Sequence, residues 1–321
     1  MKNFAITGIA GYIAPRHLQA IKETGNVLVA AMDTHDSVGT LDKYFPNASF
    51  FTEYERFDRH LEKLKRSDAE CKIDYLSVCS PNNLHDAHIR LALRVDADAI
   101  CEKPLVLNPW NLDALNVLEK EFGKRVYTVL QLRLHDSLIN LKEKLIKQSK
   151  KKKHNVELTY ITSRGIWYDY SWKGNIEKSG GIATNIGIHF FDMLIWLFGS
   201  VNSFEVQLSE KRRMGGFIEL ENANVKWFLS INYEDLPETV KTEKKSTYRS
   251  IKVDSKEIEF TEGFTNLHIK TYDKIIHQQG FGIEDARNSI ELVHKIRNAK
   301  VSLKLDKEII HYDTKKYLGV F

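Results

Sequence analysis

The segment ICEKPL, residues 100–105, places a lysine between a glutamate and a proline directly after an apolar run. That run, Asp96 to Cys101, has the length and composition of a short buried strand. Open α/β sheets bind their ligands at the carboxyl ends of the strands, where proline also stiffens the turn. An ammonium group at such a position can polarise or deprotonate a substrate hydroxyl group. Lys103 is therefore the first candidate catalytic residue.

A glycine-rich turn, GIAGYIAPRH from Gly8 to His17, follows the first apolar run and opens a helical pattern. In this context glycine lets a pyrophosphate approach the backbone, and the helix N-terminus binds it. The spacing departs from G-x-G-x-x-G, because Gly8, Gly11 and Ala14 are evenly separated by three. We predict a dinucleotide pyrophosphate at this turn; a glycine turn that binds nothing is the alternative.

The next apolar run, VLVAAMD, ends in Asp33, which lies 22 residues after Gly11. A carboxylate there can accept hydrogen bonds from both ribose hydroxyls of adenosine and repels a 2′-phosphate. Together with the glycine turn it indicates NAD rather than NADP, whereas a simple strand-end cap is the structural alternative. Because NAD carries out hydride transfer, Lys103 is expected beside a bound nicotinamide in a dehydrogenase.

The segment SVCSPNNLH, residues 77–85, reads as a strand that runs through a turn into a helix. Here we expect Ser80 and Pro81 to lie against the dinucleotide, with Asn83 and His85 near the nicotinamide ribose. The structural alternative is that one of the two adjacent asparagines only caps the helix. The sequence does not decide between these two interpretations.

A second candidate site follows in ATNIGIHFFDML, residues 183–194. Asn185 and His189 are four residues apart and share one helical face, with Asp192 three residues further on. The surrounding residues are apolar, so the helix is expected to be largely buried and its polar stripe needs partners. A substrate cleft would supply them. We expect His189 to be catalytic with Asn185 beside it; a structural histidine is the alternative.

The segment YITSRGIWYDYSWKG, residues 160–174, mixes aromatic and cationic side chains in an expected loop. Such side chains suit stacking on a base or sugar and binding of a carboxylate or phosphate. They are equally typical of an oligomer interface. The set comprises Arg164, Trp167, Tyr168, Tyr170, Trp172 and Lys173.

The elements that position these residues fall into two parts, and a chain of 321 residues suggests two domains. Before residue 130, apolar runs alternate with helical patterns, which implies an α/β domain with a mostly parallel sheet. These expected strands are Lys2–Thr7, Val27–Met32, Ile73–Cys79, Asp96–Cys101 and Arg125–Leu130.

After residue 130 strands predominate, which indicates an α+β domain with an open, largely antiparallel sheet. Its expected strands are 156–162, 201–208, 215–220, 225–231, 247–253 and 257–260. Its expected helices include 181–198, 265–276 and 282–297.

The composition is that of an ordinary globular protein, with 42% hydrophobic residues and a net charge of +4 from 47 basic and 43 acidic residues. This balance, without a basic stripe or helix-turn-helix pattern, argues against nucleic-acid binding. Three cysteines without metal-ligand spacing suggest a reduced compartment and no metal. The apolar stretches are too short to span a membrane, and the N-terminus lacks a signal-peptide core. We therefore expect a cytoplasmic protein.

The order of these segments resembles the glucose-fructose oxidoreductase / inositol dehydrogenase (Gfo/Idh/MocA) family. The resemblance covers nearly the whole chain and rests on GIAGYIAPRH, SPNNLH, CEKPL, TSRGIWY…SWKG, GGIATNIGIHFFDML and GFGIEDARNSIELVHKIR. The Glu-Lys-Pro motif is typical of the whole family. The SWKG segment and the ATNIG-H helix resemble its nucleotide-sugar branch, the UDP-N-acetyl-2-amino-2-deoxyglucuronate 3-dehydrogenases of bacterial O-antigen synthesis.

The resemblance implies an NAD-binding Rossmann domain over residues 1–130 and a substrate-binding and oligomerisation domain over residues 131–321. It also implies NAD-dependent oxidation of the C3 hydroxyl of UDP-N-acetylglucosaminuronic acid to the 3-keto sugar, in lipopolysaccharide biosynthesis. Members are commonly homotetramers, and some reoxidise NADH with 2-oxoglutarate. Alternatives are a family dehydrogenase of a free sugar or inositol, and an NAD-sensing protein without turnover.

Within the resemblance, Lys103 matches the motif lysine and His189 the helix histidine, and either can be the base. The residues assigned to the cofactor are Gly8, Gly11, Tyr12, Ile13, Asp33, Ser80, Pro81, Asn83, His85, Glu102, Lys103, Gln131 and Trp172. Those assigned to the anionic substrate are Arg16, Lys103, Arg164, Tyr168, Lys173, Asn185 and His189.

Overall fold

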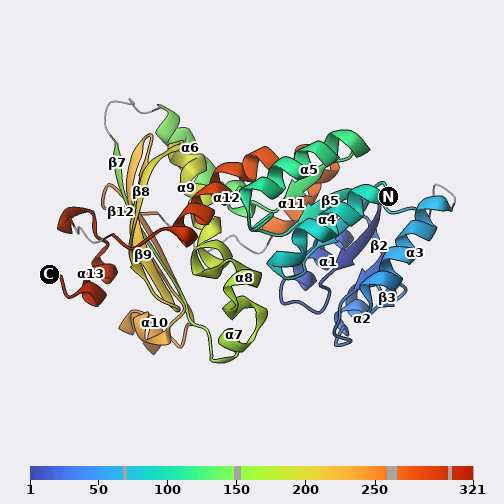
Figure 1. The fold of residues 1–321 in the computed structure, drawn as a ribbon, viewed down its shortest axis with the longest axis horizontal. Coiled ribbons are helices and arrows are strands. Elements are labelled where there is room, and N and C mark those ends of the chain that lie inside the picture. Colours follow the sequence, from blue (N-terminus) through green and yellow to red (C-terminus); the bar gives the residue numbers. More distant parts are fainter. Residues whose placement is uncertain (68–70, 148–152, 259–265, 303–305, 321) are drawn as a thin grey trace. The chain divides into compact units, whose positions relative to one another are not determined.

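The computed structural model describes residues 1–67, 71–147, 153–258, 266–302 and 306–320. The chain divides into two compact units (Figure 1). The first comprises Met1–Leu134 and Thr265–Arg287, and the second comprises His135–Phe264 and Asn288–Phe321. Residues 265–287 belong to the first unit, whereas the sequence predicts a second domain over residues 131–321. The helix in this segment buries His268 and Tyr272 in the first unit.

The first unit is built on a six-stranded sheet in the order β3-β2-β1-β4-β5-β6. All of its strand pairs are parallel, and the order reverses between β1 and β4, as in doubly wound dinucleotide-binding folds. The strands are β1 (Asn3–Thr7), β2 (Val27–Met32), β3 (Ser49–Phe51), β4 (Tyr75–Val78), β5 (Asp98–Cys101) and β6 (Val126–Thr128). The five expected strands are confirmed; β2 has the expected bounds, and the other four are shorter than expected. The sequence missed β3, which is too short to show a period.

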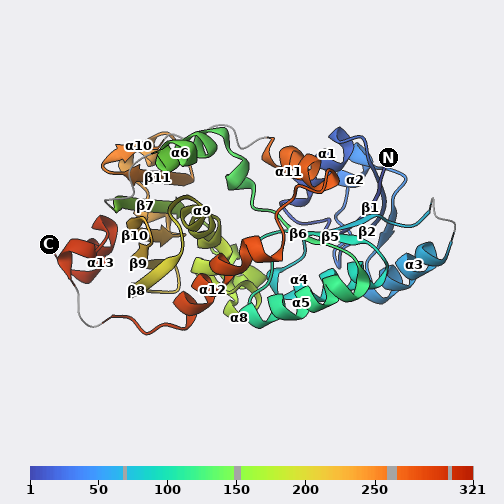
Figure 2. The same ribbon diagram turned by 90° about the horizontal axis from the view of Figure 1, so that it is seen from above.

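Helices cover both faces of this sheet. Figure 2 shows α1 and α11 on one face and α3, α4 and α5 on the other. The helices are α1 (Ala14–Glu23), α2 (Thr40–Tyr44), α3 (Tyr54–Arg66), α4 (His85–Arg94), α5 (Pro109–Phe122) and α11 (Leu267–Ile276). The core between the sheet and α11 includes Phe4, whose ring stacks on Tyr272 at 5.8 Å. This packing holds α11 against the glycine turn's helix.

The second unit contains a six-stranded sheet in the order β12-β11-β7-β10-β9-β8. Its neighbouring strands are antiparallel except for β7 and β10, which pair in parallel. The strands are β7 (His154–Thr162), β8 (Val201–Ser209), β9 (Arg213–Leu220), β10 (Ala223–Ser230), β11 (Thr247–Val253) and β12 (Lys256–Glu257). The expected strand over 257–260 is only partly covered, since residues 259 and 260 lie outside the described residues.

Different helices pack on the two faces of the second sheet. On one face Phe191 of α9 meets Trp227 edge to face at 5.2 Å, and on the other Tyr317 of α13 stacks on Phe228 at 6.1 Å. The helices are α6 (Asp136–Lys147), α7 (Trp167–Tyr170), α8 (Ile176–Ser179), α9 (Ile188–Phe198), α10 (Glu238–Thr242) and α13 (Tyr312–Leu318). A further helix, α12 (Ile283–Asn298), runs from the first unit into the second.

The helical stretch Ile176–Phe198 is long and apolar enough to cross a membrane by length and composition alone. However, 72% of its apolar window is buried inside the protein, where α9 packs on the sheet. Burial in a protein core explains this apolar composition without a lipid bilayer.

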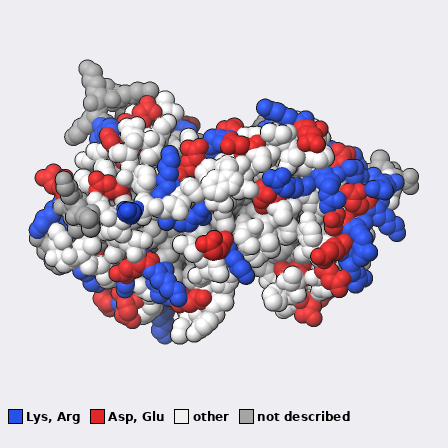
Figure 3. Space-filling view, viewed as in Figure 1, with Lys and Arg blue, Asp and Glu red and all other residues white. Residues whose placement is uncertain are grey.

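Charged side chains of both signs are interspersed over the face of the molecule seen in Figure 3. This distribution accords with the near balance of 47 basic and 43 acidic residues. A mixed surface of this kind does not concentrate positive potential along one groove on that face.

Candidate active site

The glycine turn after β1 has no room for a side chain at Gly8. Gly8 has a φ of +78°, and a Cβ atom there would lie 2.4 Å from the carbonyl oxygen of Cys79. The Gly11 amide donates to the Gly8 carbonyl at 3.0 Å, and α1 then begins at Ala14. The turn thus brings the bare backbone and a helix N-terminus together, which is the arrangement that binds a pyrophosphate. Tyr12, which lies in this turn, is 88% exposed.

Asp33 lies against this turn although 22 residues separate it from Gly11. Its Oδ2 accepts a hydrogen bond from the Ala10 amide at 2.9 Å, and its Oδ1 accepts one from the His35 amide at 2.9 Å. Each carboxylate oxygen has a further lone pair for a hydroxyl donor. The predicted ribose acceptor and the predicted pyrophosphate turn therefore lie side by side.

Two buried histidines contact the turn after β4. Ser80 is buried, and its hydroxyl contacts His88 Nδ1 at 2.9 Å. His85 is fully buried between the carbonyl oxygens of Ser80 at 2.9 Å and Pro104 at 2.7 Å. Burial lowers the pKa of His85. His85 thus joins the β4 turn to the Glu-Lys-Pro turn, and its place near the nicotinamide ribose stays a prediction.

The N-cap positions of the 3₁₀ turn Asn82–Leu84 and of α4 are Pro81 and Leu84, and neither makes a side-chain hydrogen bond there. Asn82 is buried and Asn83 is exposed, and whether one of them caps the helix stays open. Pro81 is partly exposed at the turn itself.

Glu102 is the most constrained residue of the site. It follows β5, is only 6% exposed, and its Oε1 accepts from His17 Nε2 at 2.9 Å and from His268 Nε2 at 3.2 Å. Burial alone would raise the pKa of this carboxyl, but the hydrogen bonds from the two histidines outweigh it and hold the pKa well below its ordinary value. Glu102 is therefore a buried anion. Its Oε2 accepts from the backbone amide of Lys103 at 3.2 Å.

The same three side chains have the spacing of a metal-ligand set, since the ligand atoms of His17, Glu102 and His268 lie within 4.8 Å of one another. The two histidine–carboxylate hydrogen bonds already account for these atoms. The network continues from His17 Nδ1 to the Tyr272 hydroxyl at 2.7 Å and on to Ser77 at 2.6 Å. Local sequence could not reveal it, because His268 and Tyr272 lie more than 160 residues after Glu102.

In the second unit, Asn185 and His189 lie where a π-helical segment passes into an α-helix. Residues Ala183–Gly187 form a π-helical segment that leads into α9. Asn185 and His189 are both partly exposed, whereas Ile186, Gly187 and Ile188 between them are buried. This exposure pattern fits the expected shared face, which stays a prediction. Such π-helical segments are frequent at functional sites.

Tyr168 joins this helix to the aromatic loop. It is 3% exposed, and its hydroxyl oxygen accepts a hydrogen bond from Asn185 Nδ2 at 3.0 Å. Burial raises the pKa of Tyr168. The phenol thus stays protonated, and its hydrogen remains for another acceptor.

The aromatic loop also holds Lys173 close to aromatic rings. Its ammonium lies 4.5 Å from the ring centroid of Trp172 and 5.7 Å from that of Trp167. Burial lowers the pKa of Lys173, with a smaller contribution in the same direction from Arg164. A desolvated ammonium beside another cation favours an anionic ligand.

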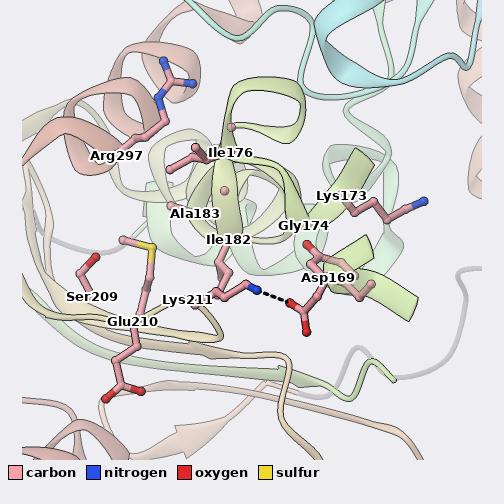
Figure 4. Close-up of a pocket in the computed structure, with 14 residues that line it drawn as sticks. Asp169, Lys173, Gly174, Ile176, Ile182, Ala183, Ser209, Glu210, Lys211 and Arg297 are labelled. Carbon is pink, nitrogen blue, oxygen red and sulfur yellow. Dashed lines mark ion pairs between the residues drawn. The ribbon is translucent and has the colours of Figure 1, made fainter. Parts of the chain in front are cut away.

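A pocket of about 140 Å³ lies beside this loop in the second unit (Figure 4). Its wall includes Tyr168, Gly180 and Ile182. Lys211 crosses it to form an ion pair with Asp169 at 3.4 Å, whereas Lys173 points away from that pair.

The predicted site residues therefore form two groups. The first unit holds the glycine turn, Asp33, the β4 turn, Glu102 and Lys103, together with Gln131 and the exposed Arg16. The second unit holds the predicted substrate residues Arg164, Tyr168, Lys173, Asn185 and His189. It also holds Trp172, which the sequence analysis assigns to the cofactor. The sequence did not identify His268 or Tyr272.

Comparison with known proteins agrees with both units. Residues 2–130 match the model of the Gfo/Idh/MocA oxidoreductase family, NAD-binding Rossmann fold, and residues 150–236 match the model of its C-terminal alpha/beta domain. The WlbA (WbpB) dehydrogenase from Thermus thermophilus is 51% identical over 97% of this chain and 99% of its own, with a TM-score of 0.92. The chain belongs to the Gfo/Idh/MocA family. It is thus an oxidoreductase with an NAD-binding Rossmann domain.

Two crystal structures of the Thermus thermophilus WlbA dehydrogenase contain ligands. One holds NAD and alpha-ketoglutarate, and the other, aligned at 50% identity with a TM-score of 0.93, holds NAD and UDP-GlcNAcA. A curated relative is the myo-inositol 2-dehydrogenase of Thermotoga maritima, 28% identical over 127 residues. That alignment covers 40% of this chain and 36% of the myo-inositol enzyme, so it spans little more than a third of this relative's length.

Proposed function

We propose that this Gfo/Idh/MocA protein oxidises the C3 hydroxyl group of UDP-N-acetylglucosaminuronic acid to the 3-keto sugar with NAD, in lipopolysaccharide O-antigen sugar synthesis. The observation that carries the proposal is the 50% identity, over 97% of this chain, to a dehydrogenase crystallised with NAD and UDP-GlcNAcA. The desolvated Lys173 and the neighbouring Arg164 support an anionic substrate.

The residues of the first unit fit NAD. A Cβ at Gly8 would strike the Cys79 carbonyl, so the turn leaves a bare backbone at the N-terminus of α1 for the pyrophosphate. Asp33 lies beside it for the ribose hydroxyls. When bound, NAD accepts a hydride from a carbon that carries a hydroxyl group.

In this mechanism Lys103 and His189 are the candidate bases for the C3 hydroxyl proton. Lys103 follows Glu102 directly and donates its amide to that anion, which fixes the backbone of the lysine. His189 shares its helix face with Asn185, whose amide nitrogen is oriented by Tyr168. Arg16, Arg164, Tyr168 and Lys173 are proposed to bind the carboxylate and diphosphate of the substrate.

We further propose that 2-oxoglutarate reoxidises NADH, that the protein is a homotetramer, and that it works in the cytoplasm. The complex of the Thermus thermophilus WlbA dehydrogenase with NAD and alpha-ketoglutarate supports the first of these statements. Production of 2-hydroxyglutarate by the purified protein would test it.

The deciding experiment is mass spectrometry of UDP-N-acetylglucosaminuronic acid after incubation with the purified protein, with and without 2-oxoglutarate. A product lighter by two hydrogens, or its decay products, is expected. Matched incubations contain the uronic acid without UDP, and myo-inositol. Conversion of either of these in preference to the UDP-sugar would favour the free-sugar alternative. Bound NAD with no conversion of any substrate would favour the sensing protein.

A further inference from the structure

We propose that Glu102 is a positioning residue for Lys103, and that His17 and His268 hold it in place as a buried anion. This inference rests on the proposed function in taking Lys103 as part of the catalytic machinery. It adds to that function a role for two histidines and for α11, a helix that the sequence assigned to the other domain.

The first step of the argument is the geometry of the carboxylate. Oε1 of Glu102 is occupied by two donors, His17 Nε2 at 2.9 Å and His268 Nε2 at 3.2 Å. Their rings meet edge to face at 5.0 Å, and the two histidines are 0% and 2% exposed. Donors from two different helices, α1 and α11, therefore fix the carboxylate from two directions. Only Oε2 is left to face Lys103.

The second step is the direction of the hydrogen bonds. Burial lowers the pKa of His17, which favours the neutral ring. A neutral ring that donates from Nε2 must accept at Nδ1, where the Tyr272 hydroxyl lies at 2.7 Å. Ser77 can in turn donate to Tyr272 at 2.6 Å. In this series of hydrogen bonds, Ser77, Tyr272 and His17 each donate to the next group. His17 is therefore held in one orientation and one tautomer.

The third step is the link to Lys103. Its backbone amide donates to Oε2 of Glu102 at 3.2 Å, and the carbonyl of the following Pro104 contacts His85 Nδ1 at 2.7 Å. The backbone of the lysine is thus held on both sides by buried groups. Misplacement of a reacting group by about 1 Å can lower a rate about 100-fold.

The charged and titratable groups that face Glu102 are few in the described part of the chain. They are His17 on α1, His268 and Tyr272 on α11, Cys79 after β4, Cys101 on β5, His85 on α4 and the adjacent Lys103. Burial raises the pKa of both thiols well above the ordinary value, so they stay neutral. The two histidines are the groups that donate side-chain hydrogen bonds to the carboxylate.

The test compares His268→Phe with His268→Gln in the full-length protein. Phenylalanine removes the donor to Glu102, and glutamine offers an amide N–H in its place. The matched control is His311→Phe in the second unit, where a histidine that is 3% exposed is lost without any contact to Glu102. Each variant is assayed for kcat, KM, the Kd of NAD and the pH profile of kcat/KM.

We expect His268→Phe to lower kcat about 10- to 100-fold while KM and the Kd of NAD change less than about threefold. The freed carboxylate can then turn to the Lys103 ammonium, which moves the acidic limb of the profile to higher pH. His268→Gln should restore most of kcat, and His311→Phe should retain it. Unchanged kcat in His268→Phe, or equal losses in both phenylalanine variants, overturns the proposal. If His268→Phe does not fold, Glu102→Gln replaces it.

A second measurement needs no substrate. Acetylation of Lys103 by acetic anhydride, followed by mass spectrometry and normalised to the exposed Lys245, should slow at least about threefold in His268→Phe. Wild-type protein that converts no sugar would remove the proposed function, and this measurement would still decide the positioning role. Unchanged Lys103 reactivity overturns it. Stoichiometric zinc bound at His17 and His268 in the purified protein would also overturn it.

Discussion

Asp33 Oδ2 accepts a hydrogen bond from the backbone amide of Ala10 at 2.9 Å, which joins the end of β2 to the glycine turn. One carboxylate therefore both contacts the glycine turn and, in the proposed function, accepts hydrogen bonds from a ribose. This double role makes Asp33 the residue at which cofactor choice can be tested.

Replacement of Asp33 by asparagine should weaken NAD binding and reduce discrimination against NADP. Asparagine keeps an acceptor for Ala10, but it loses the negative charge that repels a 2′-phosphate. We expect the ratio of the NADP and NAD dissociation constants to fall about tenfold, equivalent to about 1.4 kcal/mol. Calorimetric titration with both nucleotides measures this ratio. An unchanged ratio would mean that another group selects the cofactor.

Gly8→Ala should destabilise the protein and abolish NAD binding, because the new Cβ would lie 2.4 Å from the Cys79 carbonyl. Gly25→Ala is the matched control. Gly25 has a φ of +74°, close to the +78° of Gly8, and its Cβ would meet nothing within 4 Å. The control should lose only about 1 kcal/mol from its left-handed backbone. Urea unfolding of both variants separates the steric effect from the backbone effect. Equal losses of unfolding free energy in the two variants would contradict the steric explanation.

Lys103→Ala should abolish turnover and leave NAD binding largely intact, because the variant loses the ammonium group and keeps the glycine turn and Asp33. Single-turnover assays should show a fall in rate of at least about 100-fold. Lys245→Ala, which removes a lysine with a 66% exposed side chain, is the control. Full activity of Lys103→Ala would leave His189 as the remaining candidate base.

Tyr168→Phe should lower kcat through Asn185. Without the phenol oxygen, the Asn185 side-chain amide loses its acceptor at 3.0 Å and is held less firmly in this orientation. We expect a loss of about fivefold to tenfold, which corresponds to about 1 kcal/mol for one hydrogen bond. Affinity for NAD should not change, because Tyr168 is assigned to the substrate and not to the cofactor. A loss of NAD affinity equal to the loss of kcat would point to general unfolding.

The second unit should lose stability in acid because of His311. Burial lowers the pKa of this histidine to about 3. Below its ordinary pKa of 6.5 the unfolded chain takes up a proton that the folded protein does not bind until about pH 3. The free energy of unfolding should therefore fall as the pH drops from 6.5 to 3. Urea unfolding at several pH values measures how the free energy of unfolding depends on pH. This dependence should be shallower for His311→Gln than for the wild type. An identical pH dependence would contradict the role of His311.

The sequence by itself determined the class of each half of the protein. Alternating strand and helix patterns predicted the parallel sheet, and the glycine turn with Asp33 predicted the NAD site, because these signals are local and periodic. The segment 183–194 likewise showed a polar face in its spacing, and in the structure Asn185 and His189 are both partly exposed among buried neighbours. Strand β3 and helices such as α10 and α13 are too short for such periodicity.

Tertiary structure alone decided what surrounds Glu102. Local sequence made Glu102 part of a turn motif and left His268 and Tyr272 in a helix of the other domain. Packing brings α11 onto α1, so that a buried carboxylate receives hydrogen bonds from residues 85 positions before it and 166 positions after it. An ionised carboxylate cannot be buried without partners. Sequence spacing carries no information about which distant donors will supply them.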